Sequence, residues 1–149
     1  MLMPDINVLV DALRDDSALH EQSRRFVLAL TSGPAEFAWT SAVFTGVVRI
    51  ATNRRIYNEP VELDQALRFC DLVRGAPRAI QVEARSKYWH TFARLLMEHD
   101  LSGGDVSDAS LAAVAIEHGC TLVTWDRGFL RFRELDAVNP EAALKLLSD

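Results

Sequence analysis

The sequence is poor in several features that would point to particular classes of protein. Its only two cysteines, Cys70 and Cys120, lie in apolar segments without a CxxC spacing. We therefore expect two buried thiols in a reducing compartment rather than a disulfide or a metal site. No run of about 18 apolar residues is present, so we expect no membrane-spanning helix. The N-terminal residues lack a basic leader, and we expect a cytoplasmic protein rather than a secreted one.

The chain also lacks a break in composition, an internal repeat or a low-complexity segment. Residues 1–149 are therefore predicted to form a single domain, and a chain of this length can bury a substantial core. The composition, with 49% hydrophobic and 25% charged residues, is that of an ordinary globular protein.

The chain has fewer basic than acidic residues, and its formal net charge is -5. That charge argues against tight, non-selective binding of nucleic acids, because affinity for phosphates comes mainly from lysine and arginine. The acidic excess lies at both ends of the chain, whereas residues 41–100 carry nine basic and seven acidic side chains. A selective enzyme with a small charged cleft fits this distribution better.

The sequence does contain an alternation of short strand-like segments with longer helical ones. Apolar periodicity predicts helices over residues 7–13, 19–30, 42–52, 61–73, 86–98, 108–118 and 140–147. Short apolar segments predict strands over residues 1–4, 36–40, 79–82 and 121–124, while residues 126–139 are expected to be irregular. Asn7 and Ser107 are expected to cap the helices that follow them. The pattern predicts an α/β three-layer sandwich with a short, mostly parallel central sheet of four or five strands flanked by helices.

Carboxylates follow two of the predicted strands, at the edge where parallel α/β sheets bind ligands. Asp5 ends the first strand, Asp126 follows the last one, and Asp108 begins the helix before that last strand. Clustered carboxylates repel one another unless a cation lies between them. Oxygen ligands without His or Cys favour Mg²⁺, with Mn²⁺ as an alternative, over zinc. The three acids therefore predict a metal site suited to hydrolysis of a phosphodiester bond.

Each of these acids also has a purely structural explanation. An aspartate after a strand often caps a helix or forms a turn, and the helix dipole alone favours Asp108 at a helix start. The joint placement of the three acids is what favours a metal site. Thr124, at the end of the last predicted strand, is expected to support the cluster. Asp105, in the glycine-containing loop before Asp108, is either a solvated loop acid or a further ligand.

The motifs at this sheet edge, taken in order, resemble those of a known family. They are Asp5 with Asn7, Thr40-Ser41, TGVVRIATNRRIY at 45–57, DASLAAVAIEHG at 108–119 and LVTWDRGF at 122–129. In this order and spacing the whole chain is similar to PIN-domain nucleases, and most similar to the VapC-type toxins of bacterial toxin–antitoxin pairs. The resemblance implies a PIN-like fold and a Mg²⁺-dependent endoribonuclease that cleaves RNA. It also implies a homodimer restrained by a VapB-type antitoxin protein.

The resemblance also assigns roles to individual residues. Asp5, Asp108 and Asp126 match the family's catalytic, metal-binding acids. Ser41, together with Thr40, matches the hydroxyl that supports the first acid, and Asn7 matches the polar residue beside it.

Two positions depart from the family pattern. Gly46 and Val47 stand where an acid usually follows the second strand, and Gly128 replaces the second acid of the last motif. A site with fewer acids could hold one ion weakly, recruit Asp105, or complete its coordination with substrate phosphates and water.

Arg49, Arg54 and Arg55 lie in the net-positive middle of the chain, and they are candidates for contacts with RNA phosphates. Two other functions stay open. A phosphoaspartyl enzyme would need a lysine near the acids, but Lys87 and Lys145 do not follow a suitable strand and a DxDxT motif is absent. A catalytically degenerate PIN-like module that binds RNA or protein is the stronger alternative, because the usual acid is missing at Gly46 and Val47.

Overall fold

The computed structural model describes residues 1–148, and its centre is a sheet of five strands. The strands are β1 (Leu2–Pro4), β2 (Phe37–Trp39), β3 (Ala79–Gln81), β4 (Thr121–Val123) and β5 (Ala137–Val138). They lie in the order β3-β2-β1-β4-β5, so β1 is central. Each neighbouring pair is parallel, which confirms the predicted parallel sheet.

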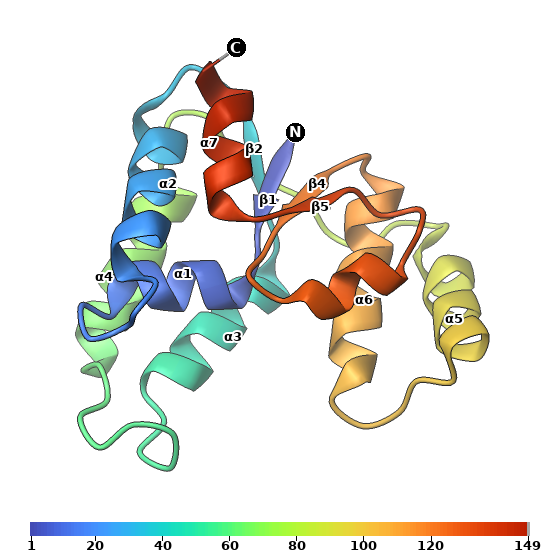
Figure 1. The fold of residues 1–149 in the computed structure, drawn as a ribbon, viewed down its shortest axis with the longest axis horizontal. Coiled ribbons are helices and arrows are strands. Elements are labelled where there is room, and N and C mark those ends of the chain that lie inside the picture. The colour runs from blue at the N-terminus through green and yellow to red at the C-terminus, as the bar shows by residue number, and fades with distance from the viewer. Residues whose placement is uncertain (149) are drawn as a thin grey trace.

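Helices cover both faces of this sheet and complete three layers (Figure 1). One layer holds α1 (Ile6–Leu13), α2 (His20–Ser32), α3 (Ser41–Ala51), α4 (Leu63–Arg74) and α7 (Pro140–Ser148), and the other holds α5 (Tyr88–His99) and α6 (Asp105–Glu117). The strands divide their side chains between two buried clusters, with Leu2 in the five-helix layer and Met3 in the two-helix layer. This alternation follows from the period of two along a strand. The predicted α/β three-layer sandwich is confirmed.

Helix α6 packs closely because its buried positions are mostly alanine. Ala109, Ala112, Ala113 and Ala115 are fully buried, and the helix contacts α5 and β4. Alanine combines the smallest side chain that still favours a helix with no loss of side-chain entropy. The first turn of α6 carries Asp105 and Asp108.

Two predicted helix caps are wrong. Asp5 rather than Asn7 caps α1, because the Asp5 carboxylate accepts a hydrogen bond from the N–H of Ile6. Helix α6 begins at Asp105, directly after Gly103 and Gly104, so Ser107 lies inside its first turn. Residues 105–107 contain a single apolar side chain, Val106, and therefore show no apolar period, although negative charge at a helix start is favourable.

The other predicted helix and strand ends agree with the structure to within two residues. The segment expected to be irregular contains a short 3-10 helix, η1 (Arg127–Arg131), and the edge strand β5. A two-residue strand leaves no alternation to detect in a sequence.

Helices α2 and α6 each contain 13 residues. A transmembrane helix needs about 20 apolar residues, and no helix within residues 1–148 is long and apolar enough to cross a membrane.

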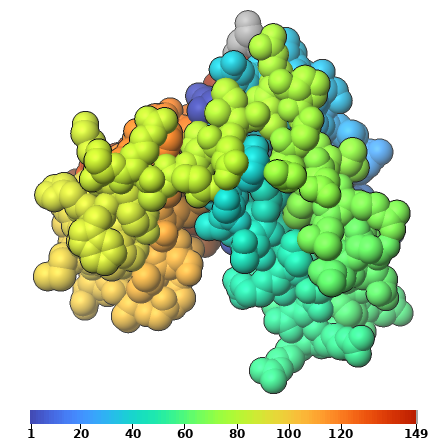
Figure 2. Space-filling view, turned by 180° about the vertical axis from the view of Figure 1, so that it is seen from behind, coloured from blue at the N-terminus to red at the C-terminus, as the bar shows by residue number. Residues whose placement is uncertain are grey.

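The surface is hollowed between two sides of the molecule (Figure 2). Helices α3 and α4 form one side, and α5 and α6 form the other. Helix α3 begins directly after β2, whereas the first turn of α6 lies at the end of that helix away from β4 (Figure 1). The carboxyl ends of the strands, near these two helix starts, are the place to look for a site.

Candidate active site

The sheet has a topological switch point between β1 and β4. From β1 the chain continues to β2 and β3 on one side, and then crosses to β4 and β5 on the other. Open parallel sheets bind ligands at the carboxyl ends of the strands beside such a switch. Pro4 of β1 is in register with Val123 of β4. Asp5 follows the first of these strands and Asp126 lies shortly after the second, so the fold brings both acids to one place.

Asp5 is buried and held in a fixed orientation. The residue is only 5% exposed, and its backbone N–H donates to the carbonyl of Val123 at 2.9 Å. One carboxylate oxygen accepts from the N–H of Ile6 at 2.7 Å. The other accepts from Thr124 Oγ1 at 2.6 Å and from Asn7 Nδ2 at 2.9 Å. These three donors leave the carboxylate little freedom to rotate.

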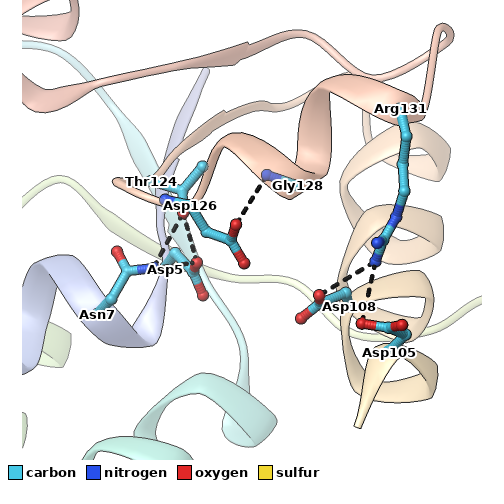
Figure 3. Close-up of polar contacts among 8 residues, drawn as sticks. All are labelled: Asp5, Asn7, Asp105, Asp108, Thr124, Asp126, Gly128 and Arg131. Atoms are coloured by element: carbon cyan, nitrogen blue, oxygen red, sulfur yellow. Dashed lines mark hydrogen bonds and ion pairs between the residues drawn. The ribbon is translucent and has the colours of Figure 1, made fainter. Parts of the chain in front are cut away.

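Asn7 and Thr124 connect Asp5 to the end of β4 (Figure 3). Asn7 Nδ2 also donates to Thr124 Oγ1 at 3.1 Å, and Asn7 Oδ1 accepts from the N–H of Trp125 at 3.1 Å. Thr124 Oγ1 in turn accepts from the N–H of Asp126 at 3.0 Å. Two of the predicted supporting residues therefore contact Asp5 directly and fix its position relative to Asp126.

Asp126 and Asp108 are more accessible than Asp5. Asp126 is exposed, and its Oδ1 accepts from the N–H of Gly128 at 2.7 Å, which caps η1. Asp108 lies in the first turn of α6 with its side chain 28% exposed. Asp126 lies between the other two acids, and the three carboxylates face the space that separates them (Figure 3).

Burial and repulsion both disfavour the charged forms of Asp5 and Asp108. Burial is the main reason why the pKa of Asp5 is raised, and the charge of Asp126 adds to it, although the hydrogen bonds to Asp5 act in the opposite direction. Burial also raises the pKa of Asp108, followed by the charge of Asp126, while the charge of Arg131 acts to lower it. A cation among the three carboxylates would relieve this repulsion.

Arg131 provides a cation at one edge of the cluster, and the sequence analysis missed it. Its Nη2 lies 3.2 Å from Asp108 Oδ2 and 3.6 Å from Asp105 Oδ1. Residues three apart on a helix share a face, so one guanidinium reaches both acids of α6. Asp105 therefore belongs to the helix rather than to the loop, and it is an exposed acid within ion-pair distance of Arg131. Arg131 lies in the segment without a recognisable period, and no sequence signal gives its direction.

The acids do not form a finished metal site in this conformation. No three His, Cys, Asp or Glu side chains within residues 1–148 are close enough together to hold a metal ion. The set of donors nevertheless fits a hard divalent ion, because the three acids supply carboxylate oxygens and no nitrogen or sulfur ligand. The guanidinium of Arg131 occupies the place of a cation beside Asp108, because it donates a hydrogen bond to that carboxylate.

Thr40 and Ser41 do not support Asp5, and this prediction is wrong. Thr40 Oγ1 accepts from the N–H of Val43 at 3.1 Å and caps α3. Ser41 Oγ donates to Glu83 Oε1 at 2.5 Å, and the Ser41 N–H donates to the same oxygen at 2.8 Å. The unpaired N–H groups at the start of α3 compete for nearby oxygen atoms. The hydroxyl that contacts Asp5 is that of Thr124.

The packing accounts for the two positions that depart from the family pattern. Gly46 faces α1, where an added Cβ atom would lie 2.3 Å from Ile6 Cδ1, and Val47 is fully buried. Neither position can present an acid to the site in this packing. At Gly128 a Cβ atom would lie 2.9 Å from Asp126 Oδ1. Glycine there leaves room for the backbone N–H to cap η1 through that oxygen.

The structure does not bring the three predicted substrate-binding arginines to the acids. Arg49 lines a groove between α3 and α4 together with Trp39 and Leu67. Arg54 and Arg55 are exposed and follow the far end of α3. This helix spans 11 residues, or about 16 Å, from its start after β2. Contacts from these arginines to RNA stay a prediction, and they would involve nucleotides away from the acids.

Comparison with known proteins decides the family. The model of the PIN domain matches residues 2–135. Ribonuclease VapC43 of Mycobacterium tuberculosis is 36% identical over 135 residues, which cover 91% of this chain and 92% of the relative. The chain belongs to the VapC family of PIN domains. Ribonuclease VapC25 of the same organism is 31% identical over 140 residues, or 94% of this chain and 99% of the relative.

Solved structures of the VapC family share the fold of this PIN domain. The VapBC2 structure from Rickettsia felis, bound to a DNA fragment from the promoter, has a TM-score of 0.67 to this chain at 20% sequence identity. The match covers 93% of this chain and 97% of that one. The predicted PIN-like fold is therefore confirmed.

Asp5→Asn is expected to change how the stability of the metal-free protein depends on pH. A carboxyl group whose pKa is raised by folding stabilises the protein fully below the pKa of the unfolded chain, and loses that contribution as the pH rises through the folded value. Asparagine does not titrate. With a chelator present, the melting temperature of the variant minus that of the parent should increase from about pH 4 to about pH 7. A constant difference would show that folding does not raise the pKa of Asp5.

Proposed function

We propose that this PIN domain is a metal-dependent endoribonuclease and the toxin of a VapBC-type toxin–antitoxin pair. The observation that carries the proposal is the position of Asp5, Asp108 and Asp126, whose carboxylates face one common space at the switch point of the sheet. It is supported by the 36% identity to a VapC ribonuclease over nearly the whole of both chains.

The roles of the acids follow from their positions. Asp5, Asp108 and Asp126 are the residues that would hold the divalent ion, for which we propose Mg²⁺, with Mn²⁺ as a substitute. When bound, such an ion lowers the pKa of a water molecule and neutralises charge on the phosphate. Asp5 contributes a carboxylate that is already oriented, because Thr124 and Asn7 fix it before any ligand arrives. Asp126 and Asp108 contribute the accessible oxygens.

A water molecule, rather than the 2′-hydroxyl of the RNA, is the proposed nucleophile. Attack by a 2′-hydroxyl needs acid–base side chains near the phosphate, and histidine is the commonest of these. Within residues 1–148, no histidine hydrogen-bonds to the three acids; His20 and His118, for example, bind the backbone carbonyls of Asp11 and Glu83. Attack by water leaves no cyclic phosphate on the products.

Cleavage of a labelled RNA by the purified chain tests the proposal. We expect cleavage in Mg²⁺, none in excess chelator, and product ends without a 2′,3′-cyclic phosphate. Cleavage that persists in chelator, or cyclic ends, would contradict it. Tight RNA binding without cleavage would instead favour the second candidate, a degenerate binding module, which the absence of an acid at Gly46 and Val47 keeps open.

The partners and the compartment are proposed from the family. We infer a VapB-type antitoxin, since solved structures with this fold include VapBC complexes. A homodimer is proposed only because the resemblance to VapC-type toxins implies one. A cytoplasmic location is supported by Cys70 and Cys120, which are buried and unpaired. Arg49, Arg54 and Arg55 are proposed to contact the RNA outside the cleavage position.

A further inference from the structure

Arg131 holds Asp108 at the edge of the carboxylate cluster, and three contacts define its position. Its Nη2 pairs with Asp108 at 3.2 Å and with Asp105 at 3.6 Å. The guanidinium carbon lies 4.9 Å from the centre of the Phe132 ring, which is itself buried. The side chain is 28% exposed, so the guanidinium is partly shielded from water, which strengthens its attraction to the carboxylates.

The short helix η1 connects this cation to the opposite side of the cluster. Asp126 caps η1 at its N-terminus, and Arg131 is its last residue. One short segment therefore carries an acid of the cluster at one end and the cation that binds another acid at its other end (Figure 3). Asp108 therefore pairs with the C-terminal end of η1, whereas Asp5 and Asp126 lie at the N-terminal end.

We propose that Arg131 is a positioning residue that binds Asp108 in the metal-free protein and competes with the divalent ion for this carboxylate. This inference rests on the proposed function, because it concerns the same ion. The absence of three converged acids within residues 1–148 fits it, since Asp108 is engaged by Arg131 instead. A guanidinium and a divalent cation repel each other, so binding of the ion displaces the arginine from Asp108.

A second observation shows that Arg131 is incompletely satisfied where it lies. Its Nε is buried and has no hydrogen-bond partner within residues 1–148. A buried donor without a partner is unfavourable, so moving the guanidinium away from Asp108 costs less than breaking a fully bonded ion pair. On this proposal the contact holds Asp108 when no ion is bound and gives way when one binds.

Titration of Mn²⁺ into the metal-free chain, followed by calorimetry, tests the competition without any RNA. Arg131→Gln should bind Mn²⁺ about threefold to tenfold more tightly than the parent, because it removes both the repulsion and the competitor. Arg127→Gln is the matched control, since it removes the same charge from an exposed position of the same helix. Loss of a merely structural residue would weaken the site, so tighter binding separates the two roles.

A second variant and a second measurement cover the case in which Arg131→Gln does not fold. Arg131→Lys keeps the charge but not the planar fork, and its affinity for Mn²⁺ should lie between those of the parent and Arg131→Gln. In the parent, the buried Nε–H of Arg131 should give an NMR signal, assigned by its loss in Arg131→Lys, that moves when Mg²⁺ is added. A signal that stays in place at saturating Mg²⁺ would overturn the proposal.

The outcomes separate this inference from the proposed function. Equal or weaker Mn²⁺ binding by Arg131→Gln, beside a parent that binds the ion, refutes the competition and leaves the metal site standing. Binding by neither protein refutes both.

Discussion

Asp5→Asn is expected to slow RNA cleavage at saturating Mg²⁺ by at least about a hundredfold, since the ion supplies several kcal/mol and each 1.36 kcal/mol is a factor of ten in rate. The variant should still fold. Asparagine is as good a helix cap as aspartate, and the substitution removes a buried charge that Asp126 repels. Single-turnover rates and melting temperatures, measured on the same samples, separate loss of the site from loss of the structure.

Asp15→Asn is the matched control for this experiment. Asp15 is an exposed acid in the turn after α1, and its substitution should leave the rate unchanged. A folded Asp5→Asn variant that cleaves as fast as Asp15→Asn would remove Asp5 from the site.

Divalent ions are expected to stabilise the protein against heat. Binding to the folded state alone adds about 2.7 kcal/mol at a hundred times the Kd, which corresponds to roughly 5–10 °C for a chain of this size. The stabilisation should come from the carboxylate cluster itself. Burial and the charge of Asp126 raise the pKa values of Asp5 and Asp108, and a bound ion would relieve that repulsion. Melting curves with Mg²⁺, and with chelator, measure the shift.

Asp126→Asn separates this local effect from general effects of salt. The variant keeps an oxygen that can accept from the N–H of Gly128, but it lacks the charge that faces the other two acids. It should lose most of the Mg²⁺-dependent shift, while an equal ionic strength of NaCl should produce little shift in either protein. A shift of equal size in parent and variant would place the bound ion elsewhere.

Much of the fold was predictable because local signals agree with the final packing. The strands β1 and β2 are short apolar segments that become buried on both faces, and glycine or proline residues end several helices. The edge strand β5 and the start of α6 escaped prediction for different reasons. Strand β5 is too short to show a period, and the single apolar residue of the first turn of α6, Val106, stands between the exposed Asp105 and Ser107 and gives no period either.

The site was predictable only as far as strand order determines it. Asp5 and Asp126 could be assigned because the carboxyl ends of parallel strands meet at one edge. The hydrogen-bond partner of each side chain could not be predicted, because it depends on which donors and acceptors the tertiary structure brings near. Ser41 therefore binds Glu83 instead of Asp5, and Arg131 was missed although it contacts Asp108.

The rate of RNA cleavage across a Mg²⁺ titration, for the parent and for Asp108→Asn, is the decisive test of whether the three acids hold a catalytic ion. We expect the parent rate to rise from zero in chelator to a plateau, whereas the folded variant should stay at least about a hundredfold slower at every concentration. Cleavage by Asp108→Asn at the parent's rate, or cleavage by the parent in chelator, would contradict it.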